Sequence, residues 1–181
     1  MEMSRRSGTP FGFPSADEAY GEIVHKVERF GLDSEFESRH QEVVGELETG
    51  RLSLHDYLES VIFYCPRPFS REEIVAFMFS QSEPFPESLR LARELARRPG
   101  LLLMTLNNES AELNLHRIAA FGLREMFTAF LSSCWLGVRK PQPAIFERAL
   151  GIVQAQPERV VTLTWPVSAL PPCVALAGES V

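Results

Sequence analysis

Short apolar segments alternate with helical patterns in the second half of the chain, and this alternation constrains the fold more than any other feature. The run from Leu101 to Thr105 follows Gly100 directly and is typical of a strand buried on both faces of a parallel sheet. Two further apolar segments, 129–133 and 159–163, are separated from it by helical stretches. Strand, helix, strand, helix, strand is the order of a doubly wound α/β fold. We therefore predict an α/β core over residues 99–163.

The first half of the chain has a helical pattern. Serine precedes glutamate by three residues at three places, the spacing of a helix-capping box. These pairs are Ser15 with Glu18, Ser34 with Glu37, and Ser70 with Glu73. A further helix is predicted to begin after Ser53. We predict a helical cap region over residues 15–98, after an irregular tail at 1–14. Residues 164–181 contain three prolines and a single charged residue, and they fit no period, so we predict an irregular C-terminal segment.

Composition excludes several classes of function. The 181 residues include 18 basic and 24 acidic side chains, and a net charge of −6 gives no electrostatic footprint for binding nucleic acid. The longest apolar run, Leu101 to Leu106, is far shorter than the roughly 20 residues that cross a membrane. The three cysteines, Cys65, Cys134 and Cys173, have no zinc or disulfide spacing, and we expect a cytoplasmic protein with no membrane contact.

Polar side chains follow the first predicted strand. Thr105, Asn107 and Asn108 lie at its carboxyl end, just before a helix, which is the usual anion-binding position in open α/β sheets. Further along, a turn presents Lys140 next to Pro141, where the next helix begins. Taken by themselves, these positions do not indicate a binding site: Thr105 is more simply interpreted as a polar residue at a strand end, and Lys140 as a solvated base on the surface.

Several motifs together resemble one known family. The core motifs are 105–109 (TLNNE), 121–123 (FGL), 132–134 (SSC), 136–141 (LGVRKP) and 157–160 (PERV), and the upstream ones are 30–33, 48–53 and 69–73. In order and spacing they resemble the haloacid dehalogenase-like (HAD) hydrolase superfamily, notably its phosphatase-like members with a small helical cap. The resemblance covers roughly residues 20–163. It implies a HAD-like, doubly wound (Rossmann-like) parallel sheet with a helical cap.

The resemblance also implies a set of reacting groups. In that family an aspartate on the first core strand attacks a phosphoryl group or a halogenated carbon, and a second aspartate acts as acid and base. A hydroxyl and a lysine hold the transferring group, which the resemblance assigns here to Thr105 and Lys140 as catalytic residues, with Asn107 and Asn108 binding substrate. Acidic residues bind Mg²⁺. A hydroxyl donor and an ammonium suit the charge that develops during such a transfer.

The sequence departs from the family pattern at both ends of the core. Residues 5–15 contain no carboxylate and no apolar run, and Thr164, Trp165 and Pro166 stand where acidic residues are due. We find neither the nucleophile nor the ligands of the expected Mg²⁺. Asp17 and Glu109 are simpler to explain as helix N-terminal charges than as replacements. We therefore expect a chain truncated or altered at both ends, catalytically impaired, without the central strand that the family places between those ending at Thr105 and Leu163.

The function that follows by descent is hydrolysis of a small phosphate ester, or a related small molecule, through an aspartyl intermediate. Two alternatives stay open. One is a non-enzymatic remnant, a pseudoenzyme, that binds an anion or a protein partner. The other is a 2-haloacid dehalogenase type of activity. For the hydrolase and for the remnant, the predicted small-molecule ligand is a phosphate ester or another anion. The sequence determines neither the identity of this ligand nor the oligomeric state.

Overall fold

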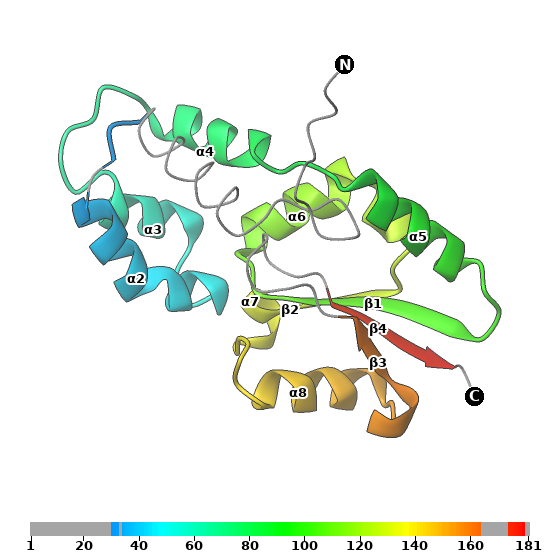
Figure 1. The fold of residues 1–181 in the computed structure, drawn as a ribbon. Coiled ribbons are helices and arrows are strands. Elements are labelled where there is room, and N and C mark those ends of the chain that lie inside the picture. The colour runs from blue at the N-terminus through cyan, green and yellow to red at the C-terminus, as the bar shows by residue number, and fades with distance from the viewer. Residues whose placement is uncertain (1–29, 33, 164–173, 180–181) are drawn as a thin grey trace, which may run out of the picture.

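The computed structural model describes residues 30–32, 34–163 and 174–179 (Figure 1). The predicted tail at 1–14, the helix start at Ser15 and the candidate Asp17 lie outside these residues. Most helix and strand bounds match the sequence pattern. The helices before the sheet are α2 (Ser34–Glu48), α3 (Leu54–Val61), α4 (Arg71–Ser80) and α5 (Pro86–Ala96).

Serine side chains mark the starts of two of these helices, as the sequence predicts. The Ser53 hydroxyl accepts a hydrogen bond from the Asp56 amide at the start of α3. Ser70 and Glu73 form a reciprocal capping box at the start of α4. α5 starts differently, because it has no side-chain cap and begins with Pro86, whose missing N–H needs no partner there.

The core alternates strands and helices. Its elements are β1 (Leu101–Asn107), α6 (Ala111–Ala120), a 3₁₀ turn (Leu123–Glu125), β2 (Ala129–Ser132), α7 (Ser133–Leu136), α8 (Ala144–Val153), a 3₁₀ turn (Pro157–Arg159), β3 (Val161–Leu163) and β4 (Val174–Glu179). The first three strands fall where the apolar segments predict them. β1 is buried from Leu103 to Asn107, which confirms a strand covered on both faces. Helices α5 and α6 lie on one face of the sheet and α8 on the other (Figure 1).

The sheet corrects two predictions. Its strand order is β2-β1-β4-β3, so Val174–Glu179 forms a strand within the segment 164–181 that we predicted to be irregular. β1 and β2 are parallel, whereas β4 is antiparallel to both β1 and β3, so the sheet is mixed rather than wholly parallel. The central place between β1 and β3 is therefore not left open. The physical reason is that two facing strand edges offer unpaired N–H and C=O groups, which any extended segment can satisfy.

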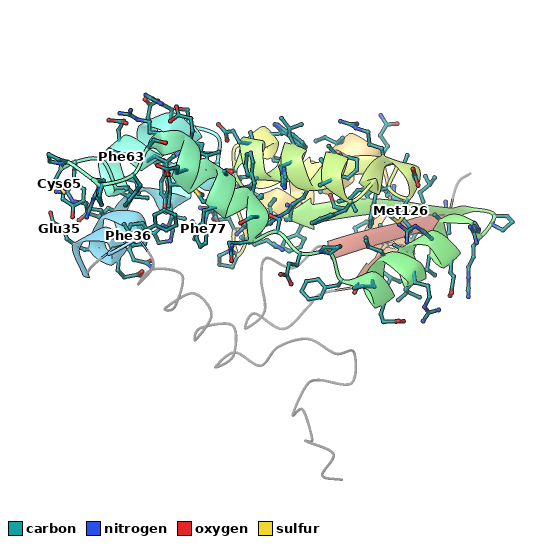
Figure 2. All side chains as sticks on the ribbon, turned by 90° about the horizontal axis from the view of Figure 1, so that it is seen from above. Glu35, Phe36, Phe63, Cys65, Phe77 and Met126 are labelled. Carbon is teal, nitrogen blue, oxygen red and sulfur yellow. The ribbon has the colours of Figure 1, made fainter. Side chains whose placement is uncertain are left out.

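Apolar side chains form separate clusters in the cap and in the core. The cap cluster joins α2, α3 and α4, and Figure 2 shows Phe36, Phe63 and Phe77 gathered at that end of the molecule. Met126 lies toward the other end, in a core cluster that also receives side chains of α5. On the opposite face of the sheet, Leu106 and Ile145 are fully buried between β1 and α8. No helix among the described residues combines the length and the apolar character needed to span a membrane.

Candidate functional site

Thr105 lies near the carboxyl end of β1 with its hydroxyl group unsatisfied. The residue is 3% exposed, and within the part of the chain that the structure describes its Oγ1 has no hydrogen-bond partner. Backbone pairing fixes its position, since Thr105 is opposite Phe130 of β2 on one side and Ala175 of β4 on the other. Buried hydroxyls in proteins are nearly always hydrogen-bonded, because burial without a partner costs free energy. Within the described residues, this hydroxyl lacks the partner that a buried hydroxyl normally has.

Lys140 is held against the end of β1 by Asn108. The Lys140 amide N–H donates to Asn108 Oδ1 over 2.8 Å, and Asn108 Nδ2 donates to the Lys140 carbonyl oxygen over 3.0 Å. The Lys140 ammonium Nζ also donates to the carbonyl oxygen of Leu106, at 3.2 Å. Leu106 follows Thr105 directly, so the structure brings together the strand end and the lysine that the sequence singles out.

Asn107 lies in a buried network instead of facing Lys140. Ser132 Oγ donates to Asn107 Oδ1 over 2.6 Å, and Asn114 Nδ2 donates to Ser132 Oγ over 2.6 Å. Asn107 Nδ2 in turn donates to Asn114 Oδ1 over 3.3 Å. These three side chains are buried and join the ends of β1 and β2 to α6. The network gives Asn107 a structural task, while its assignment to substrate stays a prediction.

Glu109, just before the start of α6, forms an ion pair with Arg117 in the last turn of the same helix. Its Oε1 also accepts a hydrogen bond from the Ser110 amide, at 3.1 Å, which is the helix-start role that the sequence predicts. Burial raises the pKa of the Glu109 carboxyl above its ordinary value, and Arg117 opposes that rise. Arg117 also donates from Nε to Ser82 Oγ over 3.1 Å. The carboxylate is thus already engaged by protein groups.

The end of α2 in the cap reaches the same region. Glu48 Oε2 lies 2.8 Å from Arg139 Nη1. The Glu48 carbonyl oxygen accepts a hydrogen bond from Ser133 Oγ, which itself accepts one from the Glu109 amide. The sequence analysis missed Glu48, Ser133 and Arg139 as neighbours of the site. All three residues lie in the motifs 48–53, 132–134 and 136–141 that resemble the family, and this could have marked them as candidates. The motifs do not indicate which of these residues pair with each other.

Cys134 lies close to these groups without the properties of a nucleophile. Burial raises the pKa of its thiol to about 11, and the neighbouring carboxylates of Glu109 and Glu112 add to that effect. A thiol with a raised pKa holds its proton at neutral pH and is a poor nucleophile. The cysteine therefore adds packing rather than chemistry to the site.

The carboxylates near Lys140 do not fit a magnesium site. Among the described residues, no three His, Cys, Asp or Glu side chains come together in a group that could hold a metal ion. Glu48 and Glu109 are paired with Arg139 and Arg117, and those cations compete directly with a metal for the oxygens. We therefore derive no chemical step through Mg²⁺ from these residues.

Comparison with known proteins identifies the family. The model of the haloacid dehalogenase-like hydrolases matches residues 9–162, which is most of the chain. The protein belongs to this family, and the resemblance drawn from its motifs is confirmed. A comparison with curated proteins gives no match.

Proposed function

We propose that this chain is a HAD-like hydrolase domain that holds the phosphoryl group of a small phosphate ester at Thr105 and Lys140 but does not hydrolyse it. Family membership supports the substrate class, since phosphate esters are what such hydrolases act on. The observation that carries the proposal is the Thr105 hydroxyl, which is 3% exposed and has no hydrogen-bond partner among the described residues. A phosphoryl oxygen would satisfy it.

The geometry around Lys140 supports the same ligand. The two hydrogen bonds to Asn108 fix the backbone of Lys140. The ammonium itself is placed at the end of β1 by its hydrogen bond to the Leu106 carbonyl oxygen, at 3.2 Å. A phosphoryl group carries negative charge, which the ammonium offsets as a point charge. The Thr105 hydroxyl would donate to one phosphoryl oxygen while Lys140 pairs with another.

The sheet order supports the loss of turnover. β4 lies between β1 and β3, where the family places the strand with the attacking aspartate, and its sequence VALAGE contains no aspartate. The one carboxylate residue of this strand, Glu179, is opposite Leu101, whereas Thr105 is opposite Ala175. The acidic residue of β4 is thus at the far end of β1 from the phosphoryl-holding groups, and the described residues of this strand offer no carboxylate nucleophile beside them for an aspartyl intermediate.

The experiment pairs a binding assay with a turnover assay. Inorganic phosphate is titrated into the full chain and followed by ³¹P NMR, and an aryl phosphate is incubated with the same protein and Mg²⁺. We expect phosphate binding without release of the aryl alcohol. Lys140→Ala should weaken phosphate binding about tenfold or more, because it removes the ammonium of the proposed site.

A matched control separates a local effect from a change in net charge. Arg97→Ala removes one positive charge from the exposed end of α5 and should leave phosphate binding unchanged. Equal binding by wild type and Lys140→Ala would overturn the proposed ligand site. Turnover of the aryl phosphate that is lost in Lys140→Ala would overturn the proposed inactivity and show a working hydrolase.

A further inference from the structure

Arg139 lies between the cap and the candidate phosphate site. Its guanidinium is one-third exposed and lies 2.8 Å from the Glu48 carboxylate, whose side chain is 23% exposed. Gly45, one turn before Glu48 on α2, lies beside it, since a Cβ on Gly45 would be in ordinary van der Waals contact with Arg139 Nη1 at 3.4 Å. The arginine therefore lies along the last turn of α2, directly beside Lys140 in the chain.

Glu48 acts electrostatically on Lys140 as well as on Arg139. Burial raises the pKa of the Glu48 carboxyl, and both Arg139 and Lys140 oppose that rise, so both cations are within its range. Glu109 on the core side is close enough for its own pKa to be raised by Glu48. The hydrogen bond from Ser133 of α7 to the Glu48 carbonyl oxygen fixes the backbone of Glu48, and the ion pair with Arg139 locates its carboxylate. A cap carboxylate is thus held next to two neighbouring cations of the core.

We propose that Glu48 sets the affinity of the site for anions by occupying Arg139 and by opposing negative charge at Lys140. The inference rests on the proposed phosphate site. An incoming phosphate adds negative charge near a carboxylate that is already there, and it competes with that carboxylate for the guanidinium. When Glu48 is neutral, Arg139 becomes a second donor for the phosphate, and a guanidinium presents paired N–H groups that match phosphate oxygens.

The test uses the full chain and inorganic phosphate. Glu48→Gln keeps the shape of the side chain and removes its charge, and we expect it to bind phosphate about tenfold more tightly than wild type, as removal of one nearby negative charge predicts. Glu48→Gln with Arg139→Gln should lose most of this gain, because the freed guanidinium is then absent. Titration calorimetry or ³¹P NMR measures the binding, and thermal melting checks that each variant is folded.

Glu46→Gln is the matched control. It removes the same charge from an exposed position two residues away on α2 and should leave phosphate affinity close to that of wild type. If Glu48→Gln binds phosphate no better than wild type, or no better than Glu46→Gln, the inference is wrong.

The same set of variants separates this inference from the proposed function. Phosphate binding that Lys140→Ala abolishes, with no gain in Glu48→Gln, overturns only the role of Glu48. A gain in Glu48→Gln that is kept when Lys140→Ala is added shows that the anion binds at Arg139 alone, and it overturns the proposed Thr105 and Lys140 site. No binding by any of the variants overturns both.

Discussion

The polar side chains at the carboxyl end of β1 differ in whether other protein groups form hydrogen bonds with them. Asn107 is tied to Asn114 and Ser132 in a closed, buried triangle. Thr105, two residues earlier, is as deeply buried, and its hydroxyl has no partner among the described residues. The triangle satisfies Asn107 within the protein, whereas the Thr105 hydroxyl is the group that we propose a phosphoryl oxygen satisfies.

Ser132→Ala tests the structural half of this division. Ser132 is fully buried and both donates to Asn107 and accepts from Asn114, so its loss leaves two amide groups unsatisfied in a dry interior. We expect the free energy of unfolding to fall by about 2–4 kcal/mol. Urea denaturation followed by circular dichroism measures it.

Ser80→Ala is the control for Ser132→Ala. Ser80 is exposed at the end of α4, and its hydroxyl donates only to a backbone carbonyl of its own helix, so the change should stay within about 0.5 kcal/mol. Equal losses in the two variants would contradict the closed triangle as a source of stability.

Sequence reasoning reached some of these residues and not others. Thr105, Asn108 and Lys140 could be found because each lies near the end of a strand or just before a helix, positions that local patterns reveal. Ser133 and Glu48 could not be paired in advance, since the hydrogen bond that joins them spans 85 residues. The buried network around Asn107 and the ion pair of Glu109 with Arg117 were not predicted for the same reason, because partners on α6 and β2 decide them.

At the scale of elements, the turn after α2 joins the cap to the core. Gly50 has a left-handed backbone with φ of +69°. A Cβ on Gly50 would overlap the backbone carbonyl of Cys134 in α7. Beside this contact, the Leu54 amide at the start of α3 donates to Glu112 of α6 over 3.1 Å. The cap is thus attached by close backbone packing at a glycine and by polar contacts on either side.

Gly50→Ala should disturb this junction. A non-glycine residue pays about 1–2 kcal/mol for a left-handed backbone, and the overlap with Cys134 adds to that cost. We expect the free energy of unfolding to fall by about 2–4 kcal/mol. Chemical denaturation checks the size of the loss, and hydrogen exchange should locate the faster exchange in the Gly50 turn and in α7.

Gly45→Ala provides the matched comparison for Gly50→Ala. Gly45 lies inside α2, and its nearest contact leaves room for a methyl group. Alanine there should stabilise the protein by about 0.5–1 kcal/mol, because glycine is unfavourable within a helix. A loss at Gly45 as large as that at Gly50 would show that the turn has no special role.

The elements that the sequence predicted best are those whose signals are local. Serine caps marked α3 and α4, and short apolar runs marked β1, β2 and β3. β4 was missed because three prolines precede it and because its pairing comes from β1 and β3, more than ten residues away in each case. A strand that forms because it pairs with distant strands is difficult to predict from its own residues.

At the scale of the whole molecule, β4 closes the sheet. It pairs with β1 from Leu101 to Leu106 and with β3 from Val161 to Leu163. Without it, the buried edge of β1 would have unpaired backbone groups along most of its length, each of which costs about 1–3 kcal/mol when buried. A domain is stable by only about 5–15 kcal/mol, so this strand decides whether the core holds together.

Leu176→Pro tests the position of β4 through the backbone alone. Residue 176 is opposite Met104 of β1 and Thr162 of β3, so proline removes an N–H from the middle of a central strand. We expect the free energy of unfolding to fall by about 3 kcal/mol or more, measured by urea denaturation, with faster hydrogen exchange in β1. Leu176→Val is the control, because it keeps the backbone N–H and should lower the stability much less than proline does. If Leu176→Pro is as stable as Leu176→Val, β4 does not occupy the centre of the sheet, and the place of the family's aspartate-bearing strand is open to another segment.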